Sequence, residues 1–451
     1  MLAAAFAEQQ RRPRRAGSVE GVTRRAGADA GVTCGRTILR REYRENARAN
    51  NHSRVCQAFM SRLRAHELTC GWLLGVAIVL GSGLGAARDA GAPPPGYVVD
   101  PSWPQQLPHD WILGQVAGLA VDSHDHVWVL QRPRSLTADE MGATQTPPRS
   151  VCCAAAPSVL EFDAMGRTLN AWGGPDYVPD WPKSEHGIWV DRADHVWIGG
   201  SGSGDRQVLK FSATGQLLME IGHSSTAAAD NRDTSLLGQP AGIQVDDAQH
   251  EVYIADGYLN NRVVVFDSDS GQFKRGWGAY GQSLAEVVAA PPPPEPGSPA
   301  RQPAADYDPG HTPERQFRTP VHCARLSLDG LVYVCDRRND RIQVFTKRGQ
   351  FLKEFRVHPA TLGNGSVWTI EFSHDPAQKY LLVADGEDNV IWIIDRNDGA
   401  VVSTLGHNGR NAGQFHWIHQ TGMDSKGNLY TGEVDTGKRV QKFVLQRDGR
   451  P

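Results

Sequence analysis

The sequence predicts an all-β fold, a six-bladed β-propeller of four-stranded antiparallel blades. The first observation is residues 239–278, where β-branched and aromatic residues alternate with polar ones between Asp, Asn and Gly turn signals. This segment reads as four short strands, GIQV, EVYIAD, RVVVFD and FKRGWG. The second observation is that the pattern recurs with a period of roughly 40 to 50 residues, which is typical of propeller blades. The third is the composition, because 48 Gly and 28 Pro in 451 residues suit a protein rich in tight turns.

The first strand of each unit gives the number of blades. Six copies align on this strand, and they begin at Ala117, His186, Ala241, His322, Trp368 and His419. The sixth unit ends after its third strand, whereas the segment GYVVDPSW, residues 96–103, precedes the first unit and has no blade of its own. We therefore expect this N-terminal segment to supply the missing outer strand and close the ring, which removes an exposed sheet edge.

The propeller is expected to span residues 96–446, with insertions between its strands at residues 134–158, 223–238 and 283–317. The last insertion contains the run APPPPEPGSPARQP, whose proline content excludes it from a sheet. Loops between strands vary without disturbing a core, so the insertions do not change the blade count.

Residues 1–67 differ from the propeller in composition, since they hold 14 Arg, no Lys and little aliphatic periodicity. We expect them to be disordered, or to be an over-long start of the reading frame, because Met60 offers a second start. Residues 68–90 contain a continuous apolar run and predict a secretory signal peptide. A retained membrane anchor through residues 68–87 is the alternative. Both interpretations predict export to a periplasmic or extracellular location.

The rest of the chain is acidic. From Gly91 onward, 32 Lys and Arg face 43 Asp and Glu, so the net charge is about −11. This charge argues against nucleic acid and anionic membrane surfaces as partners. Cys323 and Cys335 flank the predicted hairpin turn at residues 329–330, so a cross-strand disulfide and two buried free thiols are both compatible with the sequence.

Three histidines hold the same position in alternate units. His186, His322 and His419 open the innermost strand of units two, four and six. Alternate blades of a six-bladed ring lie about 120° apart, so three imidazoles at the channel mouth would converge near the axis. Three nitrogen ligands with an open fourth position are typical of catalytic zinc. The alternative is that each histidine only fills the channel.

Strand direction predicts which residues lie near these histidines. Because the strands of a blade alternate in direction, the turn between the second and third strands lies on the same face as the start of the first. Those turns carry Arg132, Tyr258 and Arg337. A tyrosine can act as general base, and an arginine can hold a carboxylate in bidentate fashion. The alternative is that all three are ordinary surface turn residues.

These motifs resemble a known family. HGIWVD, DGYLNNRVVVF, TPVHCARL, VCDRRNDRIQVF and WIHQTGMDSKGNLYTGE resemble the NHL-repeat propellers and, within them, the peptidyl-α-hydroxyglycine α-amidating lyases. The resemblance extends from the first blade to the last.

The resemblance implies a zinc-dependent carbon–nitrogen lyase in which His186, His322 and His419 bind Zn²⁺. It implies that a C-terminal α-hydroxyglycine is cleaved to a peptide amide and glyoxylate. Zinc would polarise the hemiaminal hydroxyl, Tyr258 would take its proton, and Arg132 or Arg337 would hold the terminal carboxylate. The expected partner is a small molecule or a peptide C-terminus.

The sequence departs from the family at one ligand position. The family carries an aspartate after its last histidine as a Ca²⁺ ligand, and Gln420 stands there in this chain, which argues against a structural Ca²⁺. The 451 residues include no copper monooxygenase domain to make the hydroxylated peptide, so another small hemiaminal is an alternative substrate. The alternative function is a non-catalytic NHL propeller that binds a protein or glycan partner. The sequence leaves the oligomeric state open.

Overall fold

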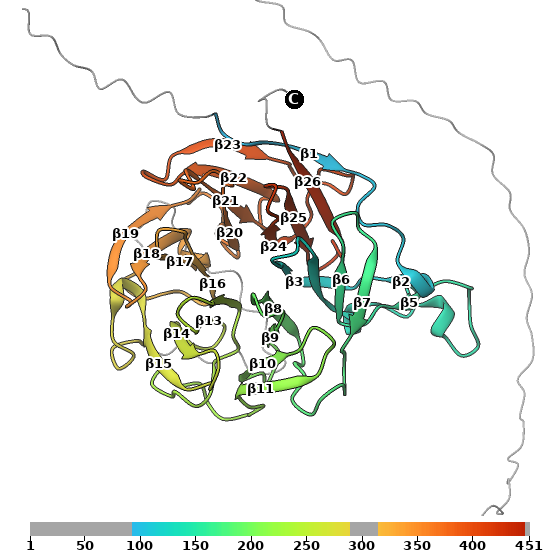
Figure 1. Ribbon diagram of the computed structural model, residues 1–451, viewed down its shortest axis with the longest axis horizontal. Helices are drawn as coiled ribbons and strands as arrows, with labels where there is room; N and C mark the ends of the chain where they lie inside the picture. Colours follow the sequence, from blue (N-terminus) through green and yellow to red (C-terminus); the bar gives the residue numbers. More distant parts are fainter. Residues whose placement is uncertain (1–92, 289–313, 447–451) are drawn as a thin grey trace, which may run out of the picture. The chain divides into compact units, whose positions relative to one another are not determined.

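The computed structural model describes residues 93–288 and 314–446, and within these ranges the chain is a ring of six four-stranded antiparallel sheets (Figure 1). The prediction of an all-β, six-bladed propeller is confirmed. The helical elements of the described residues are short 3₁₀ turns of three residues each. The predictions for residues 1–67 and 68–90 lie outside the described residues. No helix in the part that the structure describes is long and apolar enough to span a membrane.

The first three blades follow one another along the chain. Their strands are β3 Gln115–Val121, β4 Val127–Arg132, β6 Val159–Phe162 and β7 Thr168–Trp172; β8 Glu185–Val190, β9 Val196–Gly200, β10 Gln207–Phe211 and β11 Leu217–Gly222; and β12 Gly242–Asp246, β13 Glu251–Asp256, β14 Arg262–Asp267 and β15 Phe273–Trp277.

The last three blades complete the ring. Their strands are β16 Val321–Leu326, β17 Leu331–Asp336, β18 Arg341–Thr346 and β19 Phe351–Arg356; β20 Thr369–Phe372, β21 Tyr380–Asp385, β22 Val390–Asp395 and β23 Val401–Leu405; and β24 Ile418–Met423, β25 Leu429–Glu433, β26 Val440–Gln446 and β1 Gly96–Asp100.

The sixth blade joins the two ends of the described chain. β1 pairs antiparallel with β26, from Gly96 opposite Gln446 to Asp100 opposite Lys442, and is its outermost strand. The segment that has no blade of its own in the sequence therefore covers the outer edge of blade six.

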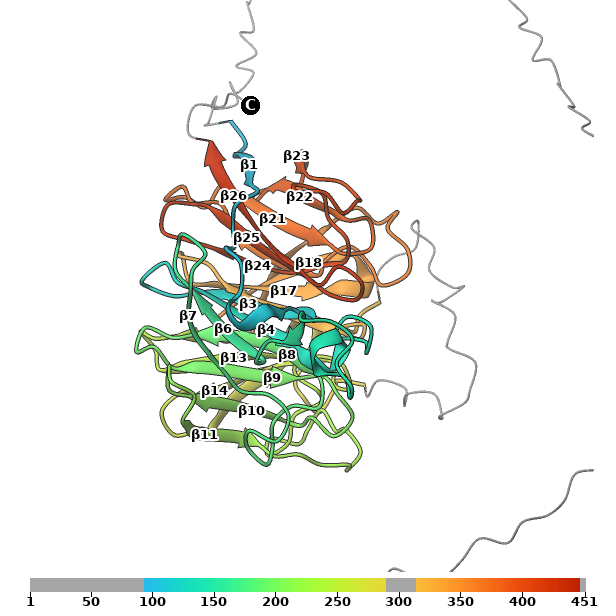
Figure 2. The same cartoon turned by 90° about the vertical axis from the view of Figure 1, so that its right-hand side faces the viewer.

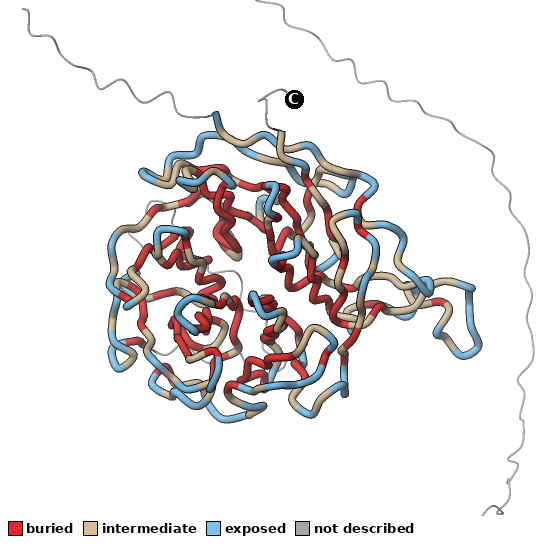
Figure 3. The backbone as a smooth tube through the Cα atoms, viewed as in Figure 1, coloured by how far each residue is buried: buried red, intermediate tan, exposed pale blue. Residues whose placement is uncertain are grey.

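Each first strand lies at the centre of the ring and each fourth strand at the rim (Figure 1). In the side view the strands run across the thickness of the ring (Figure 2). The second strands are almost wholly buried, whereas rim strands such as β11 and β23 alternate toward solvent (Figure 3). This gradient explains why the central strands read as continuous apolar runs in the sequence.

The hairpins between first and second strands are fixed by a recurring aspartate. The carboxylate of Asp122 accepts two backbone N–H groups of its own turn, each at 2.9 Å, and the indole N–H of Trp128 at 2.9 Å. Asp191 and Trp197 repeat the arrangement in blade two at 3.0 Å. Short-range acceptance of backbone N–H groups is the reason Asp favours such turns.

Glycine allows the central strands to approach one another. A Cβ atom on Gly187 would lie 2.5 Å from the carbonyl oxygen of Ala241 in the next blade. A Cβ atom on Gly118 would lie 2.8 Å from the carbonyl oxygen of His186, and one on Gly242 would lie 2.9 Å from that of His322, in each case in the next blade. These contacts bring the residue that opens each first strand close to its equivalent in the following blade.

The structure contains the cross-strand disulfide that the sequence left open. Cys323 and Cys335 are directly opposite in β16 and β17, with their Cα atoms 4.8 Å apart, and are disulfide-bonded. Cys152 and Cys153 are bonded to each other in the insertion at residues 134–158. That insertion also contains β5 Ala154–Ala155, which pairs in parallel with β2 Trp111–Ile112.

Candidate metal centre

The three predicted histidines meet at the centre of the ring. His186, His322 and His419 are the second residues of β8, β16 and β24, the first strands of alternate blades. Their ring centroids are 5.0, 4.9 and 4.7 Å apart, and one ring nitrogen from each lies within 4.8 Å of the other two. All three side chains are buried. The repeat phase therefore places three imidazoles where one metal ion could bind them together.

Two of the rings are oriented by the backbone of the following blade. His186 Nδ1 donates to the carbonyl of Ala241 at 2.8 Å, and His322 Nδ1 donates to the carbonyl of Trp368 at 2.5 Å. Since a carbonyl only accepts, Nδ1 carries the proton in both rings and Nε2 carries the lone pair. A backbone carbonyl on the second ring nitrogen is the usual way to fix a metal-binding histidine.

Within the described residues, two buried nitrogens of the triad have no hydrogen-bond partner, His322 Nε2 and His419 Nδ1. Leaving a buried polar atom unpaired costs about 1 to 3 kcal/mol. A buried polar atom without a partner requires an explanation in a native structure, and a metal ion that binds the atom is one such explanation. Of the two nitrogens, His322 Nε2 is the one that its anchored Nδ1 leaves free to bind an ion.

The surroundings keep the three imidazoles neutral, which is the state that binds a metal. Burial, and then the charges of Arg132 and Arg337, lower the pKa of His186 to about 3. Burial lowers the pKa values of His322 and His419 well below the ordinary value, with further lowering by Arg337 and by the neighbouring rings.

Tyr258 lies beside the triad, as the strand directions predicted. It is in the turn between β13 and β14, and its hydroxyl is 2.8 Å from His186 Nε2. Because Nε2 carries the lone pair, the tyrosine hydroxyl donates to it. The same ring lies 6.0 Å from that of His322, between centroids. Tyr258 therefore shares the nitrogen that a metal would use.

The two predicted arginines also lie at this mouth. Arg132 Nε donates to the carbonyl of Glu185 at 2.7 Å and Arg132 Nη1 to Gln115 Oε1 at 2.8 Å. Arg337 is 5% exposed, and its Nε donates to the carbonyl of Asn364 at 3.0 Å. Burial lowers the pKa of both arginines, and the nearby Tyr258 opposes this shift.

Among the described residues, no carboxylate lies within 4.0 Å of Arg132 or Arg337, and the nearest negative charges, such as Glu185 for Arg132 and Glu387 for Arg337, act at longer range. A buried cation without a counter-charge is costly unless a ligand supplies one. The mouth is therefore suited to an anionic ligand.

Trp368 and Asn364 are contacts of the centre that the sequence did not single out. Trp368 orients His322 through its carbonyl, and its ring lies 4.3 Å beneath the Arg337 guanidinium. The signal for Trp368 was its repeat position, which it shares with the histidines. Asn364 lies in the loop after β19 and no sequence pattern marks it.

The position that argued against calcium lies deeper along the axis. Gln420 is buried and lines a cavity of about 10 Å³ with Arg325 and Thr369 among its neighbours. It offers an amide oxygen where a carboxylate would be needed, and a guanidinium lines the same space.

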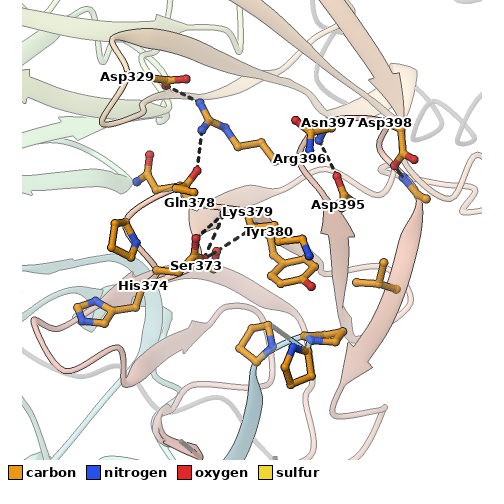
Figure 4. Close-up of a pocket in the computed structure, with 18 of the residues that line it drawn as sticks. Asp329, Ser373, His374, Gln378, Lys379, Tyr380, Asp395, Arg396, Asn397 and Asp398 are labelled. Carbon is orange, nitrogen blue, oxygen red and sulfur yellow. Dashed lines mark hydrogen bonds and ion pairs between the residues drawn. The ribbon is translucent and has the colours of Figure 1, made fainter. Parts of the chain in front are cut away.

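A large hollow of the described residues lies elsewhere. It has a volume of about 1500 Å³ and is lined by the first turns of blades four and five, the rim of blade five and residues 93–95 (Figure 4). Arg396 bridges this hollow to Asp329 at 2.5 Å and to the hydroxyl of Tyr333 at 2.7 Å. No predicted site residue lines it. Arg396 and Asp329 form an ion pair there, unlike the two arginines at the histidines.

Comparison with known proteins gives distant relatives. No protein-family model matches the chain. Peptidyl-glycine alpha-amidating monooxygenase B of Xenopus laevis is 26% identical over 256 residues, which are 54% of this chain and 24% of that protein. The chain thus spans about a quarter of the frog monooxygenase.

Two further relatives match over a larger share of their own length. NHL repeat-containing protein 3 of Homo sapiens is 27% identical over 368 residues, covering 77% of this chain and 84% of that protein. A probable peptidyl-alpha-hydroxyglycine alpha-amidating lyase of Caenorhabditis elegans is 24% identical over 237 residues, covering 52% and 56%. Among solved structures, a streptogramin B lyase aligns with a TM-score of 0.43 at 12% identity over 78% of this chain and 98% of that chain. The chain is a six-bladed β-propeller whose homologues include NHL repeat-containing protein 3 and peptidyl-α-hydroxyglycine α-amidating lyase.

Proposed function

We propose that this propeller is a zinc-dependent lyase that cleaves a C-terminal α-hydroxyglycine to a peptide amide and glyoxylate. The observation that carries the proposal is the buried histidine triad with Tyr258 on one of its nitrogens and two arginines lacking counter-ions beside it. The homology to amidating enzymes supports this choice among the reactions that such a site could perform.

The residues present fit a zinc ion. Three neutral imidazoles with one open position form the donor set that catalytic zinc prefers. His322 Nε2 is buried without a hydrogen-bond partner in the described part of the chain, which is consistent with an ion between the rings. His186, His322 and His419 would hold the ion, and the ion would supply Lewis acidity toward a hydroxyl oxygen.

The other residues would move the proton and orient the substrate. Tyr258, in its deprotonated form, would accept the proton of the hemiaminal hydroxyl as the carbonyl of glyoxylate forms and the C–N bond breaks. The proton would return to the departing amide nitrogen, so atoms and charge balance. Arg132 or Arg337 would hold the substrate carboxylate, because each is a cation without an anionic partner in the described residues. Trp368 keeps Arg337 in place from beneath.

The substrate class follows from this chemistry. We propose a small hemiaminal carboxylate or the hydroxylated C-terminus of a peptide, and no nucleic acid. We further propose that the chain is exported through residues 68–90, to a periplasmic or extracellular location, with a membrane tether through residues 68–87 as the alternative. The Cys323–Cys335 disulfide supports an oxidising compartment.

The rival function is a non-catalytic propeller that binds a protein or glycan. It is favoured by NHL repeat-containing protein 3, which matches a larger share of both chains than the amidating enzymes do. We propose that catalysis better explains the unpaired nitrogens and arginines, since a docking surface requires neither.

One experiment separates the two functions. Purified protein is dialysed exhaustively, its zinc content is measured, and glyoxylate release from an N-acyl-α-hydroxyglycine is followed with the N-acylglycine as control. Stoichiometric zinc and release above the uncatalysed rate are expected, and both should vanish in His322→Ala. Zinc-free protein, or zinc-bound protein that releases no glyoxylate, would reject the lyase.

A further inference from the structure

Three blades share an ion pair between a buried carboxylate and an arginine on the face that carries the histidines. The carboxylate is the last residue of the second strand, and the arginine is the first residue of the third strand or, in blade six, the residue just before it. The pairs are Asp256–Arg262 at 2.8 Å, Asp336–Arg341 at 2.6 Å and Glu433–Arg439 at 2.8 Å. A buried carboxylate is stable there because a guanidinium neutralises it.

Blades one and two keep the charge balanced in another way. Gln131 lies opposite Ser158 and Gly200 opposite Gln207, so neither position carries a charge. Blade five alone breaks the balance, because Asp385 lies directly opposite Val390. Asp385 is fully buried.

A second carboxylate approaches the place of the missing arginine. Asp385 Oδ2 accepts from Thr361 Oγ1 at 2.8 Å and from Trp392 Nε1 at 3.0 Å. Asp388 Oδ2 lies 2.8 Å from the same Thr361 hydroxyl. No Lys or Arg of the described residues forms an ion pair with Asp385 or Asp388.

The side chains around Asp385 and Asp388 supply too few protons for both carboxylates. The hydroxyl of Thr361 has one proton but lies at hydrogen-bond distance from two carboxylate oxygens. His358 Nδ1 is 2.9 Å from that hydroxyl and 3.4 Å from Asp388 Oδ2, and its ring stacks on Trp392 at 4.2 Å. Asp385 Oδ1 accepts the backbone N–H groups of Glu387 and Asp388 at 3.1 and 3.0 Å, so the uncompensated charge lies at the two Oδ2 atoms, which share one hydroxyl proton.

We propose that blade five carries a second metal site, in which a divalent cation held by Asp385, Asp388 and His358 replaces the arginine of the other blades. The ligand atoms of these three residues lie within 4.8 Å of one another. Two carboxylates with an imidazole and a hydroxyl form a mixed oxygen and nitrogen set, which suits Mn²⁺ or Zn²⁺ better than Ca²⁺. His358 and Asp388 are 36% and 44% exposed, so an ion can enter from solvent.

The electrostatics of Asp385 agree with this geometry. Burial, with a smaller contribution from the charge of Asp388, raises the pKa of Asp385 to about 7. The ionised carboxylate is therefore unfavourable without a partner, and a bound cation would supply one.

The site does not depend on the proposed lyase activity, and counting metal equivalents distinguishes the two centres. Full-length protein is stripped with chelator, equilibrated with Zn²⁺ or Mn²⁺ and desalted, and bound metal is measured together with the melting temperature. We expect two equivalents in the wild type, one in Asp388→Asn and one in His322→Ala. Loss of metal in His322→Ala alone would overturn the blade-five site, and loss in Asp388→Asn alone would overturn the triad.

The other blades suggest the substitution that tests the blade-five site most directly. Val390→Arg restores the ion pair of the other blades, so it should raise the melting temperature of metal-free protein and abolish the metal response of blade five. Val402→Arg, which adds the same charge on exposed β23, should do neither. If the wild type shows no metal response and is stabilised by acid alone, the cluster holds a proton and the proposal is wrong. If Val390→Arg does not fold, Asp388→Asn still decides, because its metal affinity should fall at least tenfold.

Discussion

Tyr258→Phe separates a proton acceptor from a metal ligand. In the structure the tyrosine hydroxyl donates to His186 Nε2 at 2.8 Å, and His186 Nδ1 is fixed as a donor by the Ala241 carbonyl. A metal that binds this Nε2 must first displace the hydroxyl. A hydrogen bond of this kind contributes about 0.5 to 1.5 kcal/mol. Removing it should tighten metal binding by roughly two- to tenfold, since about 1.4 kcal/mol is a factor of ten.

The same substitution should nevertheless abolish most of the activity. Loss of a positioned proton acceptor typically lowers a rate by about 10²- to 10⁴-fold. Metal affinity is measured by competition with a chromogenic chelator, and kcat by glyoxylate release under saturating zinc. Tyr280→Phe is the matched control, because its hydroxyl contacts Arg341 and Glu354 in another part of the fold.

The two readouts are expected to move in opposite directions. A Tyr258→Phe protein that binds zinc at least tenfold more weakly would show that the phenol is a ligand, and the reasoning from the tautomer of His186 would be refuted. A variant with unchanged kcat would exclude Tyr258 as the proton acceptor.

Three further predictions concern stability. Gly187→Ala should lower both stability and metal affinity, because its Cβ would lie 2.5 Å from the Ala241 carbonyl that orients His186. Gly96→Ala is the control and should change neither, because the nearest neighbour of its Cβ would be 3.9 Å away. Chemical denaturation and zinc competition test this pair. Asp336→Ala should cost about 3 to 5 kcal/mol in urea unfolding because it leaves Arg341 buried without its partner, and a loss under 1 kcal/mol would contradict that role. Metal-free protein should lose up to about 4 kcal/mol of stability as the pH rises from about 4 to 7. The raised pKa of Asp385 causes this loss, because the folded state holds a proton that the unfolded chain has released. Asp385→Asn should flatten this slope in melting curves, and an unchanged slope would exclude Asp385 as its source.

The fold and the triad were predictable because both depend on the phase of a repeat. Alternation of apolar and polar residues fixed the strands, and the unit count fixed the blades. His186, His322 and His419 share one phase, so ring symmetry alone brings them together. Tyr258 followed from strand direction, since the turn that holds it must lie on the same face.

The remaining contacts depend on distances that a sequence does not contain. Asn364 reaches Arg337 from a loop without repeat character, and only the packed structure shows that its carbonyl accepts there. The missing partner of Asp385 required knowing that Val390 is directly opposite it in the ladder. The cysteine pair was left open because thiols and a disulfide share the same hairpin pattern.

The least anchored histidine lies where the ring closes. His186 and His322 each donate Nδ1 to the equivalent residue of the following blade, but His419 is in blade six and is followed round the ring by blade one. Within the described residues, Nδ1 of His419 finds no such carbonyl. The third ligand is therefore oriented mainly by its two neighbouring rings and by whatever ion they share, so ordering of His419 should be the structural change that accompanies metal binding.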